Sequence, residues 1–121
     1  MKPSKTREVL LSGTYDFTAP NFIGVEIFKH YPKILKYSVH DSVELIELYR
    51  QISGQIEFIN PSKISLGNRQ AAYDLTFDID LKGMVYVALS LEVNGDLWTG
   101  DMQLKQGLIR KGFDRFFEIH R

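Results

Sequence analysis

Residues 73–93 read YDLTFDIDLKGMVYVALSLEV, and this stretch dominates the prediction of the fold. Over 73–81 an apolar residue takes every second position, and polar residues fill the gaps. Because successive side chains of a strand point to opposite faces, this pattern predicts one buried face and one solvated face. Residues 82–83 supply a turn, after which the alternation resumes. The Asn-Gly pair at 94–95 favours a hairpin, because both residue types tolerate positive φ.

We therefore predict a three-stranded antiparallel meander over 71–104. Its neighbours in the sheet are shorter strands, expected at 8–17, 21–28 and 55–59, with a weaker one at 34–39. The Pro and Asn residues within 18–21 predict a turn between the first two strands. Five or six of these strands together form an antiparallel sheet.

Two helices complete the expected fold. The first covers about 41–53, where Asp41 is a capping residue and apolar residues recur at steps of three and four. The second covers about 105–120, with Phe113, Phe116 and Phe117 on one face despite Gly112 inside it. Packing both helices on one face of the sheet gives an α+β fold. The side chains expected to be buried are Leu75, Phe77, Val87, Leu89, Phe113 and Phe117.

The length of 121 residues fits a single domain over 1–121, in which 1–7 are expected to be frayed. Apolar runs are too short for a signal peptide or a membrane helix, so we expect a cytoplasmic protein with no membrane partner. The formal net charge of zero argues against a nucleic-acid partner, because such proteins usually carry a basic excess.

Catalytic motifs are missing from the sequence. The absence of Cys excludes thiolate zinc sites, iron–sulfur clusters and thiol catalysis. His30, His40 and His120 are scattered, with no spacing that indicates a metal site or a catalytic group. We therefore predict no enzyme, no catalytic residue, no metal and no cofactor.

Acidic residues concentrate in the middle of the chain. Residues 71–103 contain six Asp and Glu against one Lys, a net charge of −5 in a neutral protein. One interpretation is a solvated strand face that discourages edge aggregation. The other is a docking surface for a basic partner. The candidate partner-binding residues are Asp74, Asp78, Asp80, Asp96 and Asp101.

The order of elements resembles a known protein family. A helix leads into GQIEF at 54–58, a hairpin follows in LTFDIDLKGMVYV at 75–87, and LKQGLIRKGF at 104–113 opens the last helix. This pattern is similar to small bacterial immunity proteins of the wall-associated, contact-dependent toxin type. The resemblance implies a non-enzymatic monomer or homodimer that binds and neutralises a cognate toxin domain in the cytoplasm. It supplies no fixed functional residues.

Two other functions stay open from the residues themselves. The first is a small-molecule-binding protein or an uncharacterised enzyme with a pocket between sheet and helices. The second is a purely structural or oligomeric module.

Overall fold

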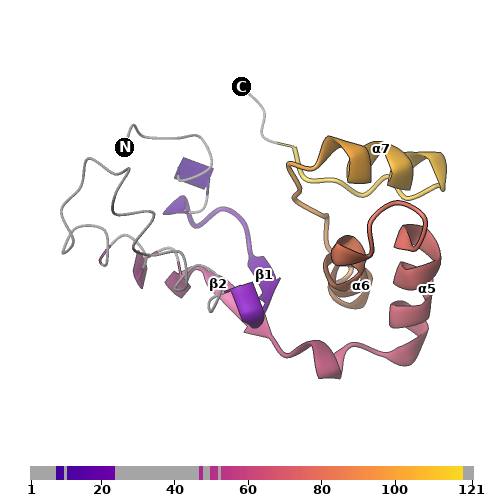
Figure 1. The fold of residues 1–121 in the computed structure, drawn as a ribbon. Coiled ribbons are helices and arrows are strands. Elements are labelled where there is room, and N and C mark those ends of the chain that lie inside the picture. Colours follow the sequence, from indigo (N-terminus) through magenta and orange to yellow (C-terminus); the bar gives the residue numbers. More distant parts are fainter. Residues whose placement is uncertain (1–7, 10, 24–46, 48–49, 52, 119–121) are drawn as a thin grey trace, which may run out of the picture. The chain divides into compact units, whose positions relative to one another are not determined.

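The computed structural model describes residues 8–9, 11–23, 47, 50–51 and 53–118 (Figure 1). The chain divides into two compact units, Met1–Ile59 and Asn60–Arg121. The frayed segment expected at 1–7 and the weak strand expected at 34–39 lie outside the described residues. The single-domain organisation stays a prediction.

The described part of the first unit contains a small parallel sheet. Strand β1 (Phe17–Pro20) pairs with β2 (Ile56–Ile59), so that Phe17 lies opposite Ile56 and Pro20 opposite Ile59. The amide of Asn21 then donates to the Ile59 carbonyl at 2.9 Å, which extends the pairing one residue past Pro20. The short strand predicted over 55–59 is confirmed, but its partner is parallel.

The other predictions for the beginning of the chain are wrong where the structure tests them. Residues 8, 9 and 11 are helical, so the strand predicted over 8–17 does not form. The predicted turn at 18–21 is mostly strand, since β1 runs through Pro20. Residues 22–23 are helical, and residues 24–28 of the predicted strand at 21–28 lie outside the described residues.

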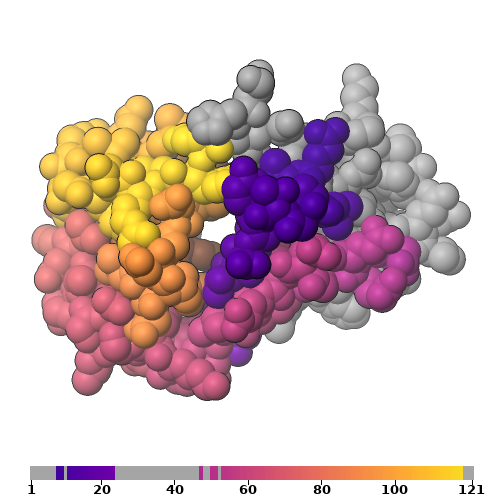
Figure 2. Space-filling view, turned by 180° about the vertical axis from the view of Figure 1, so that it is seen from behind, coloured from indigo at the N-terminus to yellow at the C-terminus, as the bar shows by residue number. Residues whose placement is uncertain are grey.

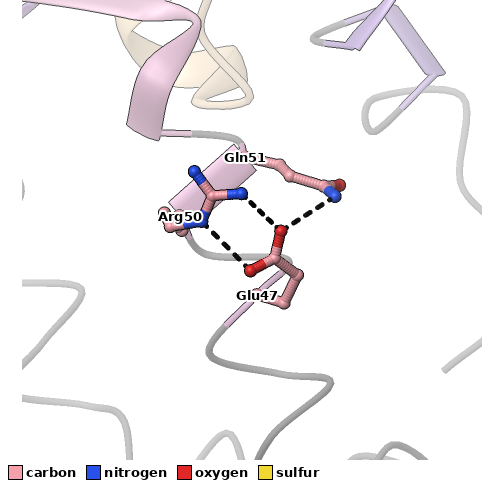
Figure 3. A network of polar contacts seen from close by, with 3 residues as sticks. All are labelled: Glu47, Arg50 and Gln51. Atoms are coloured by element: carbon pink, nitrogen blue, oxygen red, sulfur yellow. Dashed lines mark hydrogen bonds and ion pairs between the residues drawn. The ribbon is translucent and has the colours of Figure 1, made fainter.

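The described residues of the helix predicted at 41–53 are helical, and Asp41 lies outside them. Glu47 accepts two bonds from Arg50, at 3.0 Å from Nε and 2.6 Å from Nη2 (Figure 3). Gln51 Nε2 adds a third bond at 3.3 Å. The Arg50 hydrogen bond lowers the pKa of the exposed Glu47 carboxyl. This network is local, because its partners lie three and four residues apart on one helix.

The second unit begins with a short 3₁₀ helix and then α5. Helix η1 (Pro61–Lys63) starts where Asn60 Oδ1 accepts from the Ser62 amide at 3.0 Å. Helix α5 (Leu66–Thr76) starts at Ser65, whose hydroxyl oxygen accepts from the Asn68 amide. These side chains satisfy amides that have no partner within the helix.

Helix α5 buries a face with helical spacing. Ala72 and Thr76 are fully buried, and the Thr76 hydroxyl donates to the Ala72 carbonyl at 2.8 Å. The helix therefore occupies the first part of the predicted meander. Leu75 is half-buried and Phe77 is exposed, so neither residue is buried as predicted.

Helix α6 replaces the second predicted strand. It covers Met84–Val93 and follows directly from η2 (Leu81–Gly83), where the sequence predicts a hairpin turn. Val87 and Leu89 are buried as predicted. A run that is apolar on all sides suits a central helix as well as a buried strand, and its periodicity does not distinguish them. The Asn94 backbone does adopt positive φ (55°), but it ends α6 rather than turning a hairpin.

The last helix is shorter and earlier than predicted. Helix α7 covers Met102–Arg110, and Gly112 ends the helical path with a φ of +93°. The three phenylalanines of the predicted helical face therefore belong to the segment after α7. Of these, Phe113 is buried as predicted, whereas Phe117 is only half-buried.

Helix α6 packs against α5, and α7 also contacts α5, so α5 joins the three helices of this unit (Figure 1). The core contains Ile64, Ala72, Val87, Ala88, Leu89, Leu97, Leu104, Leu108 and Phe113. The predicted α+β fold, an antiparallel sheet of five or six strands, is therefore wrong. The described residues form an α/β arrangement with a two-stranded parallel sheet.

Candidate functional site

The predicted acidic row on a strand face does not exist, because its residues are distributed over a helix end and several loops. Asp74 lies on α5 and accepts a hydrogen bond from Gln70 at 3.0 Å. Asp78 follows the helix and forms an ion pair with Lys111. The Lys111 ammonium also donates to the Asp74 backbone carbonyl at 3.1 Å, so it joins these two positions. Its hydrogen bond lowers the pKa of the Asp78 carboxyl.

Asp80 and Asp101 share a different role, since each begins a helix. Asp80 is half-buried and accepts from the Lys82 amide at 3.0 Å at the start of η2. Asp101 is exposed and accepts from the Leu104 amide at 3.1 Å at the start of α7. Both caps use the Oδ1 atom. A carboxylate at a helix N-terminus is stabilised there by the amide groups and the helix dipole.

The segments that carry these two carboxylates touch through glycines. A Cβ atom at Gly83 would lie 2.9 Å from the Leu104 side chain, and one at Gly107 would lie 2.6 Å from the Ile79 side chain. Both distances are shorter than real Cβ contacts, so a side chain at either position would force the facing Leu104 or Ile79 side chain to shift. Asp80 and Asp101 each lie about one turn from the contact between Gly83 and Leu104.

Asp96 has a different partner from the other four candidates. Its carboxylate is 3.9 Å from Arg115 Nε, and Arg115 also donates to the Asn94 side chain and carbonyl at 2.6 and 2.8 Å. Asp96 thus belongs to the contacts that hold the chain after α7. His30, His40 and His120 lie outside the described residues.

The described residues contain no group of three or more His, Asp or Glu side chains that could hold a metal ion between them. Mg²⁺ does not require such a group, since it is often held by one or two carboxylates together with water and substrate phosphates. The carboxylates of Asp80 and Asp101 carry oxygen atoms of the kind that Mg²⁺ accepts as ligands. Asp78 is less suited, because its carboxylate already pairs with an ammonium group.

A family model described as PIN domain matches residues 1–116, which is nearly the whole chain. The chain belongs to the PIN domain family. Neither a curated protein nor a solved structure matches it.

Membership of the PIN domain family overturns several predictions from the sequence. PIN domains are typically metal-dependent nucleases, so the resemblance to immunity proteins is wrong. The predictions of a non-enzymatic protein, of a toxin domain as partner and of no nucleic-acid partner are wrong for the same reason. The alternative of an uncharacterised enzyme fits the PIN domain better.

The physical reasons for these errors lie in the evidence that the predictions used. A net charge of zero describes only the long-range attraction between a protein and a nucleic acid. A nuclease that uses metal ions needs carboxylates to bind them, and these carboxylates offset the charge of its basic residues. A site made of separate carboxylates also has no short motif. Sequence reasoning missed the helix caps at Asp80 and Asp101, although Asp101 has a signal that could have found it, because it is an Asp directly before the first residue of α7. None of the helices in the described part of the PIN domain is long and apolar enough to span a bilayer.

Proposed function

We propose that this PIN domain is a metal-dependent nuclease that cleaves RNA. The single observation that carries the proposal is the family match over residues 1–116. The described part of the chain supports it by offering carboxylates at two helix starts.

We assign the metal-binding role to Asp80 and Asp101. Both carboxylates lie on segments in direct contact, through Gly83 and Leu104. The caps occupy one oxygen of each carboxylate, Oδ1, in a bond to a backbone amide. A bound divalent cation would supply charge stabilisation for the phosphate and a more acidic water molecule. The protein's own contribution is to hold the two carboxylates in fixed directions.

The test separates the charge of these residues from their capping role. Asn caps a helix about as well as Asp, so Asp80→Asn and Asp101→Asn remove the charge and preserve the helix start. Asp96→Asn is the matched control, because Asp96 is an exposed carboxylate from the same acidic region that caps no helix. Cleavage of a labelled single-stranded RNA is measured with Mg²⁺ or Mn²⁺ and with EDTA.

We expect the wild-type protein and the Asp96→Asn control to cleave, and EDTA to stop the cleavage. Each of the other two variants should lose about 100-fold or more in kcat/KM, since a metal contributes several kcal/mol to the transition state. Their thermal midpoints should stay near that of the wild type. Wild-type protein without metal-dependent cleavage would contradict the proposed function. Active Asp80→Asn and Asp101→Asn variants would contradict only the assignment of these residues.

A further inference from the structure

Two aromatic rings lie stacked on the surface of the second unit. Tyr73 and Phe77 are four residues apart at the end of α5, with ring centroids 5.7 Å apart and planes inclined by 21°. Tyr73 is 44% exposed and Phe77 is 53% exposed. In the space-filling view, the salmon residues of α5 reach the surface beside the yellow residues near the C-terminus (Figure 2). Most of a core ring would be covered, so this pair does not serve the core.

A lysine from α7's C-terminal end completes the feature. Lys111 Nζ lies 4.8 Å from the centroid of the Phe77 ring. Its bonds to Asp78 and to the Asp74 carbonyl hold the ammonium group beside the ring. We call Tyr73, Phe77 and Lys111 the aromatic platform.

We propose that the aromatic platform binds single-stranded RNA by stacking a base on the rings, with the lysine at the adjacent phosphate. This inference rests on the proposed function and names the form of its substrate. Exposed aromatic side chains next to basic groups bind single strands without strong sequence preference, because every base has a π-face. Double-stranded RNA keeps its bases stacked on each other, so it does not offer a free base to the rings.

Local charge allows this ligand. The Lys111–Asp78 ion pair lies beside the Phe77 ring and adds no net charge there. A phosphate can replace the Asp78 carboxylate as the partner of Lys111, since both are anions that accept charge-assisted hydrogen bonds. A second copy of the chain fits less well. A twofold contact would bury two copies of the Lys111–Asp78 pair, and buried ion pairs lose much of their attraction to desolvation.

The experiment measures binding apart from cleavage. A fluorescein-labelled single-stranded RNA of about 12 nucleotides is titrated with protein in EDTA, and fluorescence anisotropy gives Kd. The variants are Tyr73→Leu and Phe77→Leu, which keep an apolar side chain and remove the ring. The control is Leu66→Ala on the same helix, because Leu66 is 80% exposed and carries no ring. The KM for cleavage with Mg²⁺ is a second readout.

We expect each ring variant to raise Kd about tenfold, which corresponds to about 1.4 kcal/mol and lies in the range for loss of one stacked base. The Leu66→Ala control should bind like the wild type, and a duplex of the same length should be insensitive to all three changes. Loss of binding in the ring variants would support the aromatic platform even if no cleavage were seen.

Three results would overturn the inference. One is no RNA binding by the wild-type protein. Another arises if the wild-type protein cleaves RNA and the ring variants keep its Kd and KM. That result would leave the proposed function intact. The third is a wild-type dimer in sedimentation velocity that the ring variants turn into a monomer without a change in RNA affinity. That result would assign the rings to a contact between copies.

Discussion

Residues 55–59 and 73–81 have the same alternation of apolar and polar side chains, yet they fold differently. The first stretch forms β2, which pairs with β1 along its whole length. The second begins inside α5, leaves the helix after Thr76 and continues as a turn in which two amides donate to the Thr76 carbonyl. Alternation alone therefore does not specify a strand. A strand also needs a neighbouring strand to pair with. Where a capping residue such as Ser65 starts a helix upstream, the same residues can become helical instead.

The burial of two phenylalanines gives the largest expected contrast. Phe113→Ala should reduce the free energy of unfolding by about 3–5 kcal/mol, because the ring is 6% exposed and its loss leaves a cavity. Phe77→Ala should cost less than about 1 kcal/mol, since an exposed ring leaves no cavity and surface changes have small effects. Urea unfolding followed by circular dichroism measures both. Equal losses would restore the strand interpretation of 73–81, in which Phe77 is a core residue.

A proline at residue 70 tests whether α5 is a helix. Gln70 lies in the middle of α5, but it precedes the predicted meander at 71–104. Gln70→Pro should destabilise the protein by about 3 kcal/mol or more and lower the helical signal at 222 nm, because proline removes a helix hydrogen bond and clashes with the preceding turn. Gln70→Ala is the control and should change stability by only a few tenths of a kcal/mol. A stable Gln70→Pro variant would mean that residue 70 lies in a loop.

At the end of α7, the sign of the stability change caused by Gly112→Ala distinguishes the observed helix from the longer predicted one. In a helix that continued through 105–120, Gly112→Ala would stabilise the protein by about 1 kcal/mol. The structure gives Gly112 a φ of +93° with nothing within 4 Å of an added Cβ. The strain is thus in the backbone, and Gly112→Ala should destabilise by about 1–2 kcal/mol. Thermal unfolding measures the difference, and a raised midpoint would favour the longer helix.

The smallest expected effect is a change in how the free energy of unfolding depends on pH when Glu92 is replaced. The Ser65 amide and the Asn68 side chain donate to Glu92 at 2.8 and 3.0 Å and lower the pKa of its carboxyl from the ordinary 4.5. A lowered pKa in the folded state means that the contribution is present above pH 4.5 and is lost as the pH falls through the folded value. Glu92→Gln keeps an acceptor oxygen and removes the titration. Its unfolding free energy should therefore fall less steeply below pH 4.5 than that of the wild type, and an identical slope would exclude this role.

How far the sequence predicts this protein depends on how local the deciding interaction is. The strand at 55–59, the helical residues near 50 and the positive φ of Asn94 follow from short patterns and are found. The topology is not predictable in this way, because α6 is apolar on all sides and its period is ambiguous. The parallel pairing of β1 and β2 joins residues about 40 apart and has no signal in either strand.

The candidate site shows the same division. The concentration of acidic residues at 71–103 is visible in the sequence, and a partner-binding role for them stays a prediction. Only Asp80 and Asp101 lie at helix starts, and the capping chemistry of an Asp directly before a helix accounts for their placement. The close approach of residues 79–83 to α7 depends on what faces Gly83 and Gly107. That information belongs to the folded chain and not to either segment alone.

The pairing of Leu97 with the chain after α7 has a consequence for the motions of this unit. Leu97 donates to the Arg115 carbonyl at 2.8 Å and accepts from the Phe117 amide at 2.9 Å, so the residues on both sides of α7 are fastened to each other. The helix is thus enclosed in a loop whose ends are tied. Its amides should exchange with deuterium together with those of Leu97 and Phe117 in one cooperative opening. The start of α7, which carries Asp101, would then keep its orientation for as long as Leu97 stays paired with residues 115–117.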